Sequence, residues 1–124
     1  MRRLSAAAVL AAAVLVLAVP AAAHAGNDKG ASCALSVDAG GFLHATGSGF
    51  TAGEYQYEIY AVPSGASAGG GQLSPAAGGT LDWGSPDPVT FYLGVYPGTT
   101  GLTLSIYGLH SGLRDLVASC DLAP

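Results

Sequence analysis

Ser67 is the one serine within a known catalytic sequence pattern, but the segment around it does not suit catalysis. Residues Gly65-Ala66-Ser67-Ala68-Gly69 match G-x-S-x-G, the pattern of the hydrolase nucleophile elbow. That elbow requires a strand before it and a helix after it, within a larger α/β domain. Here the pattern lies in a stretch of Gly, Ala and Ser, so it gives Ser67 no catalytic setting.

The histidines do not assemble an active site either. His44 alternates with apolar neighbours and is expected to face outward, and His110 is expected in a turn. Ser111 and Asp115 follow His110, but a catalytic triad is rarely made of sequence neighbours. Because the chain also lacks H-E-x-x-H and any Cys/His cluster, we predict surface histidines, no metal site and no cofactor.

The paired carboxylates are spaced unfavourably for chemistry. Glu54 and Glu58 project from one strand face, where positions four apart are roughly 13 Å apart. Acid–base work on a glycosidic bond needs about 5–10 Å. Asp82 and Asp87 offer too few oxygen ligands in register for calcium. The sequence therefore predicts no catalytic residues and a protein that is not an enzyme.

Aromatic side chains are the one suggestive feature. Four tyrosines fall on the polar phase of expected strands, and the tryptophan lies near an expected loop; these are Tyr60, Tyr92, Tyr96, Tyr107 and Trp83. Rigid amphipathic rings on an exposed face suit contact with a sugar, a peptide or a small molecule. The alternative is that sheet surfaces favour tyrosine in any case. We treat these five residues as possible ligand contacts.

The elements that must position them begin after an export signal. Residues 1–25 combine Arg2 and Arg3, an uncharged run rich in Ala, Val and Leu, and Ala23-His24-Ala25, the parts of a cleaved signal peptide. A retained anchor is the alternative, because the apolar run is about long enough to span a bilayer. We expect a secreted protein, extracellular or associated with the cell envelope, with a flexible leader over 26–31 and one domain over 32–124.

Charge and cysteines describe the exported domain. After cleavage the chain keeps two positive residues, Lys29 and Arg114, against eight acidic ones, a net charge of −6. Nucleic acid and anionic membranes are therefore excluded as partners. In an exported protein the only two cysteines, Cys33 and Cys120, are predicted to form a disulfide that encloses nearly the whole domain.

The apolar pattern has a period of two. Strands are expected around 33–37, 42–47, 54–61, 80–83, 89–96, 102–107 and 115–120, with Phe91, Leu93 and Val95 inward and Tyr92 and Tyr96 outward. Residues 64–79, rich in Gly, Ala and Ser, are expected to form a mobile loop, with a brief strand possible near Gln72. The prediction is an all-β antiparallel sandwich of seven to eight strands.

The disulfide constrains the strand order. In a simple up-and-down order of seven strands, the start of the first and the end of the last lie roughly 20 Å apart. Disulfide Cα atoms lie within about 7 Å. An eighth strand, a crossover that breaks the alternation, or cysteines in mid-strand would each resolve this, and the sequence does not choose among them.

Residues Gly47–Glu54 resemble the G-x-G-F-x-x-G-E motif of bacterial secreted immunoglobulin-like domains. The resemblance implies an immunoglobulin-like sandwich in which this motif joins the second strand to the third. The chain is also distantly similar to enediyne-carrier apoproteins, although these carry two cysteine pairs and this chain carries one.

These observations predict a secreted, non-catalytic binding or interaction module. Its ligand outside the cell could be a protein, a glycan or a small molecule. A small-molecule carrier with an aromatic-lined cleft is the alternative, and a small secreted hydrolase is a remote one. Because a fold hosts many functions, the resemblance indicates architecture and leaves the ligand open.

Overall fold

The computed structural model describes residues 30–51, 53–110 and 112–122, so the expected signal peptide and most of the expected leader lie outside the described residues. Within them, seven strands and one short helix follow each other along the chain: β2 (Ser32–Val37), β3 (Phe42–Ser48), β4 (Glu54–Val62), β5 (Ser67–Leu73), β6 (Leu81–Pro88), α1 (Val89–Gly94), β7 (Gly101–His110) and β8 (Leu113–Asp121). Ala31, the last residue of the expected leader, is buried.

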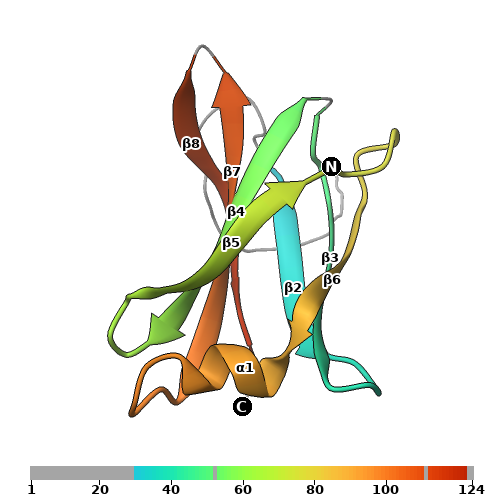
Figure 1. The fold of residues 1–124 in the computed structure, drawn as a ribbon. Helices are drawn as coiled ribbons and strands as arrows, with labels where there is room; N and C mark the ends of the chain where they lie inside the picture. The colour runs from blue at the N-terminus through green and yellow to red at the C-terminus, as the bar shows by residue number, and fades with distance from the viewer. Residues whose placement is uncertain (1–29, 52, 111, 123–124) are drawn as a thin grey trace, which may run out of the picture.

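The strands form two antiparallel sheets packed as a sandwich (Figure 1). One sheet has the order β2-β3-β6, and the other has the order β5-β4-β7-β8. The predicted all-β antiparallel sandwich is confirmed, with seven strands.

The core lies between the sheets and follows the period-two pattern. Side chains with less than 2% exposure come from both layers and include Leu43, Ile59, Leu102, Leu104 and Ile106. Alternate residues of β4 are buried throughout the strand, as its sequence predicted. The opposite phase of β4 therefore faces outward, and with it the matching positions of β7.

The corner between β3 and β4 explains the motif over Gly47–Glu54. Gly49 has a φ of +85°, and a Cβ there would lie 2.8 Å from the carbonyl oxygen of Gly30. Phe50 is buried and meets the ring of Tyr55 edge-on, with centroids 5.6 Å apart. The Tyr55 hydroxyl donates a hydrogen bond to the carbonyl of Thr51, which ties the corner to the start of β4.

Residues 89–96 form α1 and the turn after it, so the strand predicted there is wrong. The helix lies at the end of the sandwich where β6 finishes (Figure 1). The residues that pack on the core are Val89, Tyr92, Leu93 and Tyr96. These positions have the i, i+3, i+4, i+7 spacing of a helix face. Phe91, expected inward, is 52% exposed instead.

Residues 64–79 are also corrected, because strand β5 occupies their centre. Glycines suit this edge strand because side chains from neighbouring elements approach its backbone closely. A Cβ on Gly69 would lie 3.0 Å from the ring of Tyr92, and one on Gly71 would lie 3.1 Å from the Tyr57 hydroxyl. Tertiary packing therefore holds a segment whose composition alone predicted a loop.

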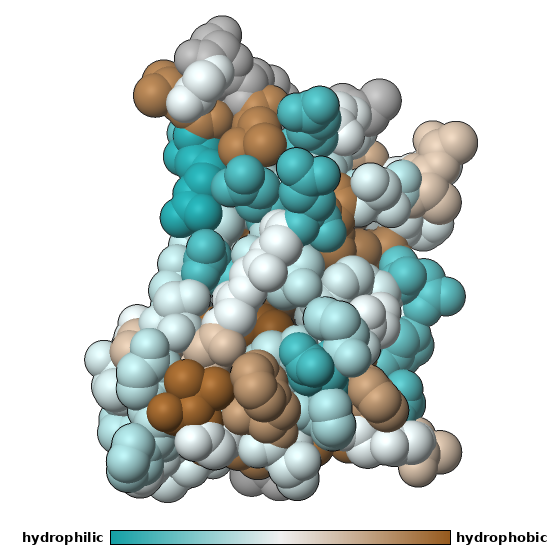
Figure 2. All heavy atoms as spheres, in the orientation of Figure 1, coloured by the Kyte–Doolittle hydropathy of each residue, from teal (hydrophilic) through white to brown (hydrophobic). Residues whose placement is uncertain are grey.

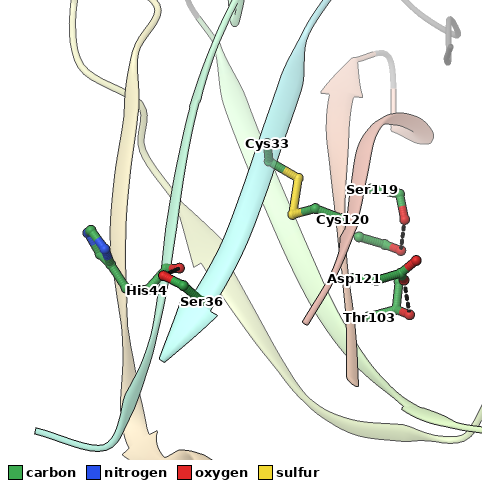
Figure 3. The surroundings of a disulfide bond; sticks show 8 residues. Cys33, Ser36, His44, Thr103, Ser119, Cys120 and Asp121 are labelled. Carbon is green, nitrogen blue, oxygen red and sulfur yellow. Dashed lines mark hydrogen bonds between the residues drawn. A yellow bond between two sulfur atoms is a disulfide. The ribbon is translucent and has the colours of Figure 1, made fainter. Parts of the chain in front are cut away.

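The predicted disulfide between Cys33 and Cys120 is present and joins the two sheets (Figure 3). Its Cα atoms are 5.7 Å apart. The strands alternate in direction from β2 to β8, so the first and last run the same way, and Leu35 and Leu122 form a parallel bridge. The expected separation is avoided because the two strands are staggered, so that the start of β2 lies beside the end of β8.

No helix within the described residues is long and apolar enough to cross a membrane.

Candidate binding surface

The five aromatic residues singled out in the sequence fall into two groups. Tyr60 and Tyr107 lie on the outer face of the four-stranded sheet, as their strand phase predicted. Trp83, Tyr92 and Tyr96 pack against the core near β5, β6 and α1. The five therefore do not line one shared cleft.

Tyr60 and Tyr107 are brought together by the antiparallel pairing of β4 with β7. In that register Tyr60 faces Thr103 and Gln56 faces Tyr107, so the two tyrosines lie on the same face with the Glu58–Ser105 pair between them. The length of the two side chains closes this gap. Their hydroxyl oxygens are 2.9 Å apart and share a hydrogen bond.

An ion pair between Arg114 and Glu58 lies beside the tyrosines. The guanidinium carbon of Arg114, on β8, lies 4.1 Å from the ring centroid of Tyr107 in a cation–π arrangement. The same guanidinium lies 3.5 Å from a carboxylate oxygen of Glu58, on β4. Ser67, on the neighbouring strand β5, donates a hydrogen bond of 2.5 Å to the other oxygen of that carboxylate. We call these five residues, Glu58, Tyr60, Ser67, Tyr107 and Arg114, the tyrosine face.

Further polar pairs extend the tyrosine face along β7 and β8. Thr103 donates a hydrogen bond of 2.6 Å to the carboxylate of Asp121, and the hydroxyls of Ser105 and Ser119 are 3.4 Å apart. Figure 2 shows the wider pattern, with hydrophobic surface gathered around α1 and at the opposite tip, and a polar band between them. The tyrosine face therefore belongs to a surface rich in hydroxyl groups and carboxylates.

The Tyr107 hydroxyl is held in its neutral form. Burial raises the pKa of Tyr107 above its usual value of 10.0, and the hydrogen bond with Tyr60 raises it further, whereas Arg114 acts in the opposite direction. A tyrosine hydroxyl can both donate and accept hydrogen bonds. The pair can exchange hydrogen bonds with a polar ligand.

The second aromatic group fills the side of the sandwich where β5 and β6 end their sheets. Tyr92 is 3% exposed, so the prediction that it faces outward is wrong; it is a buried residue of the helix. Burial raises its pKa. The Tyr57 and Trp83 rings lie with centroids 4.7 Å apart, and the Tyr96 hydroxyl donates a hydrogen bond of 2.8 Å to the carbonyl of Ser67.

His44 is the only histidine whose side chain the structure describes. Its Nε2 lies 2.6 Å from a carboxylate oxygen of Asp82, on the outer face of the three-stranded sheet. The Ser36 hydroxyl donates to the main-chain carbonyl of His44, so within the described residues no serine hydroxyl bonds to the ring (Figure 3). Ser111 and the side chain of His110 lie outside those residues.

No group of three or more His, Cys, Asp or Glu side chains in the described part of the chain could hold a metal ion. Glu54 and Glu58 lie on the outward phase of β4, as predicted, but Glu58 is engaged with Arg114 and Ser67.

Sequence reasoning missed three members of the tyrosine face: Glu58, Ser67 and Arg114. The sequence places Glu58 on an outward strand face with no predicted partner and Ser67 in the expected loop, and it marks Arg114 by its charge alone. Arg114 did carry one usable signal, because it is one of only two positive residues after position 25. Which strands lie next to β4 could not be read from the pattern.

No family model, no curated protein and no solved structure matches this chain.

Proposed function

We propose that this protein is a secreted, non-catalytic binding module whose ligand contacts the tyrosine face. The observation that carries the proposal is the hydrogen-bonded pair of Tyr60 and Tyr107, with Arg114 stacked on one of its rings. Rigid aromatic side chains with polar tips give large contact area at a small cost in conformational entropy. An ordered pair of this kind on an exposed sheet suits recognition.

The side chains of the tyrosine face restrain one another before any ligand arrives. Glu58 accepts from Ser67 and faces Arg114, and Arg114 in turn covers Tyr107. Side chains that are already ordered lose less freedom on binding, which favours affinity. The exposed ion pair itself contributes little to stability, because water screens it. We therefore assign this cluster a role in binding rather than in holding the fold.

A binding role also agrees better with the side-chain geometry than the two alternatives do. A carrier using all five aromatic residues needs them around one cleft, whereas they lie in two groups. A hydrolase needs a nucleophile beside a base, and the described histidine ring meets a carboxylate alone. Export and location at or outside the cell surface remain part of the proposal, and the disulfide is compatible with them.

A retention experiment tests the proposal. The purified protein is immobilised and exposed to an extract of the producing cell's own envelope, and the retained polymer, protein or small molecule is identified. Tyr60→Ala and Tyr107→Ala should each reduce retention at least tenfold. His44→Ala, on the outer face of the other sheet, is the matched control and should leave retention unchanged. Equal retention by all variants would contradict the proposal.

A further inference from the structure

The side of the sandwich away from the disulfide carries a strand edge that pairs with no other described strand. β6 and β5 each end their sheets there (Figure 1). The β6 edge contains Pro86 and Pro88, which cannot donate main-chain hydrogen bonds, as is usual for protected edges. β5 contains neither a proline nor a charged residue. An unprotected edge of this kind is a template for another extended chain.

The free part of this edge is its second half. At the start of β5, the carbonyl of Ser67 already accepts a hydrogen bond from Tyr96. Gly70, Gly71 and Gln72 are exposed. Their main-chain groups bond to no described residue outside β4. A segment of main chain is thus available for strand addition.

Tyr57, a buried residue, lies directly beneath this segment, and its hydroxyl has no hydrogen-bond partner among the described residues. Tyr57 is 6% exposed, and a Cβ on Gly71 would lie 3.1 Å from its hydroxyl oxygen. That hydroxyl forms no hydrogen bond with any residue in the described part of the chain. Leaving a buried hydroxyl unsatisfied is unfavourable, and such groups point to a missing partner. The position of Tyr57 at the edge places that partner beside β5.

The two faces of an added strand would meet different neighbours. On the inner face lie the Tyr57 hydroxyl and the half-buried ring of Trp83, whose centroid is 4.7 Å from that of Tyr57. On the outer face the Glu58 carboxylate covers Gly70, with an oxygen 3.2 Å from the position of a Cβ there. Because strand side chains alternate between faces, inward and outward residues of the occupant need different chemistry.

We infer that the β5 edge binds an extended peptide that alternates basic residues with residues carrying an uncharged hydrogen-bonding group. Its main chain pairs with Gly70–Leu73, as in other cases of strand addition. Inward residues hydrogen-bond to Tyr57 and contact Trp83. Outward basic residues face Glu58 and are attracted by a domain of net charge −6 after position 25.

A second copy of this chain suits the edge less well. Its own β5 would present glycines to Tyr57, which leaves the hydroxyl unmet. It would also bring a second Glu58 to the same place, and two domains of charge −6 repel each other. The occupant is therefore a different chain with positive charge.

The experiment titrates the full protein with a nine-residue peptide that alternates Lys and Thr. Trp83 is the only tryptophan, so its fluorescence reports contact at this edge directly. We expect a saturable change in emission, and no change with a peptide that alternates Glu and Thr. Absence of saturable binding by the Lys/Thr peptide would overturn the inference.

Two variants separate the edge from general charge effects. Tyr57→Phe should weaken binding at least tenfold. Gln72→Lys adds a positive charge on the edge and should also weaken it tenfold, whereas Gln56→Lys, directly opposite on β4, should change it less than threefold. Equal binding by Tyr57→Phe and the unmodified protein, or equal effects of the two lysine variants, would overturn the inference. So would a dimer in light scattering that Gln72→Lys abolishes, because it would assign the edge to a second copy.

The edge site shares Glu58 with the tyrosine face, but its inward contacts, Tyr57 and Trp83, lie outside that face. Tyr107→Ala should therefore weaken the Lys/Thr titration less than threefold, even though it reduces retention of the envelope partner at least tenfold. Loss of peptide binding in this variant would place the peptide on the tyrosine face and contradict the edge site.

Discussion

The hydroxyl oxygens of Tyr60 and Tyr107 lie 2.9 Å apart, although the residues are 47 positions apart in the chain. The two side chains can meet because β4 and β7 are neighbours in the four-stranded sheet, although the two strands are not consecutive in the sequence. Substitutions at this pair therefore test both the register of these two strands and the proposal that the side chains of the binding surface are ordered.

A double-mutant cycle measures that contact. Tyr60→Phe and Tyr107→Phe each remove one hydroxyl, and a part-exposed hydrogen bond of this kind contributes about 0.5–1.5 kcal/mol to the free energy of unfolding. Because the two residues share the bond, the double variant should lose less than the two single losses together, with a coupling of about 0.5–1 kcal/mol. Denaturant unfolding of the four proteins gives the coupling. Strictly additive losses would mean that the bond does not form in solution.

The disulfide is expected to contribute a large share of the stability. Cys33 and Cys120 are 87 positions apart in the sequence, and replacing both by Ser should lower the free energy of unfolding by about 2–4 kcal/mol, mainly because the unfolded chain is then less restricted. Denaturant midpoints with and without the substitutions check this. Two alkylatable thiols in the native protein would contradict the disulfide, and mass spectrometry detects them.

Gly49 should be far less tolerant of substitution than another glycine. Gly49→Ala places a Cβ 2.8 Å from the Gly30 carbonyl oxygen in a backbone of positive φ, so we expect a loss of more than about 1 kcal/mol. Gly84→Ala, where nothing lies within 4 Å of the added Cβ and φ is ordinary, is the matched control and should cost less than about 0.5 kcal/mol. Comparable losses at both positions would argue against the described corner.

Tyr57→Phe should leave the free energy of unfolding unchanged or raise it by up to about 1 kcal/mol, because it removes a buried hydroxyl that has no partner in the described part of the chain. Thermal and denaturant unfolding in the absence of ligand measure the change. A loss above about 1 kcal/mol would show that the hydroxyl has a stabilising partner in the free protein. Tyr55→Phe, which removes a hydrogen-bonded hydroxyl, is the control and should lower the free energy of unfolding.

Stability should fall as the pH rises above about 10. Burial raises the pKa of Tyr57, Tyr92 and Tyr107 above 10.0 in the folded state, so between 10.0 and these raised values the folded protein holds protons that the unfolded chain has lost. Proton release then favours unfolding, and the free energy of unfolding decreases with pH in that window. Denaturant midpoints from pH 8 to 11 test the direction. A midpoint that stays constant across pH 10 would contradict the burial of these hydroxyls.

The strands that the sequence predicted correctly are those whose apolar residues alternate over a long run. β4 is the clearest case, since its buried and exposed residues alternate without interruption. The strand predicted over 89–96 was wrong because apolar residues also occur there at alternate positions. The residues that pack on the core, Val89, Tyr92, Leu93 and Tyr96, have helical spacing instead. β5 was predicted only as a brief strand near Gln72, because its glycines are explained by side chains of other elements, which local composition cannot reveal.

The candidate surface was predictable only in part. Outward placement of Tyr60 and Tyr107 followed from strand phase, but their contact needed the sheet order. Arg114, on β8, contacts Tyr107 and Glu58. Ser67 donates a hydrogen bond to Glu58 from β5, an edge strand in a segment that was predicted to be a loop. Residues on four strands form the surface, and no short motif connects them.

The most direct test of the binding role is quantitative retention of the envelope partner by the unmodified protein, by Tyr60→Ala with Tyr107→Ala, and by His44→Ala. The double variant should unfold at a lower denaturant concentration because it loses the shared hydrogen bond, but all three proteins should be fully folded without denaturant, so that a difference in retention reports the surface. The tyrosine face predicts a loss of at least tenfold for the double variant and none for His44→Ala. Undiminished retention by the folded double variant would contradict it.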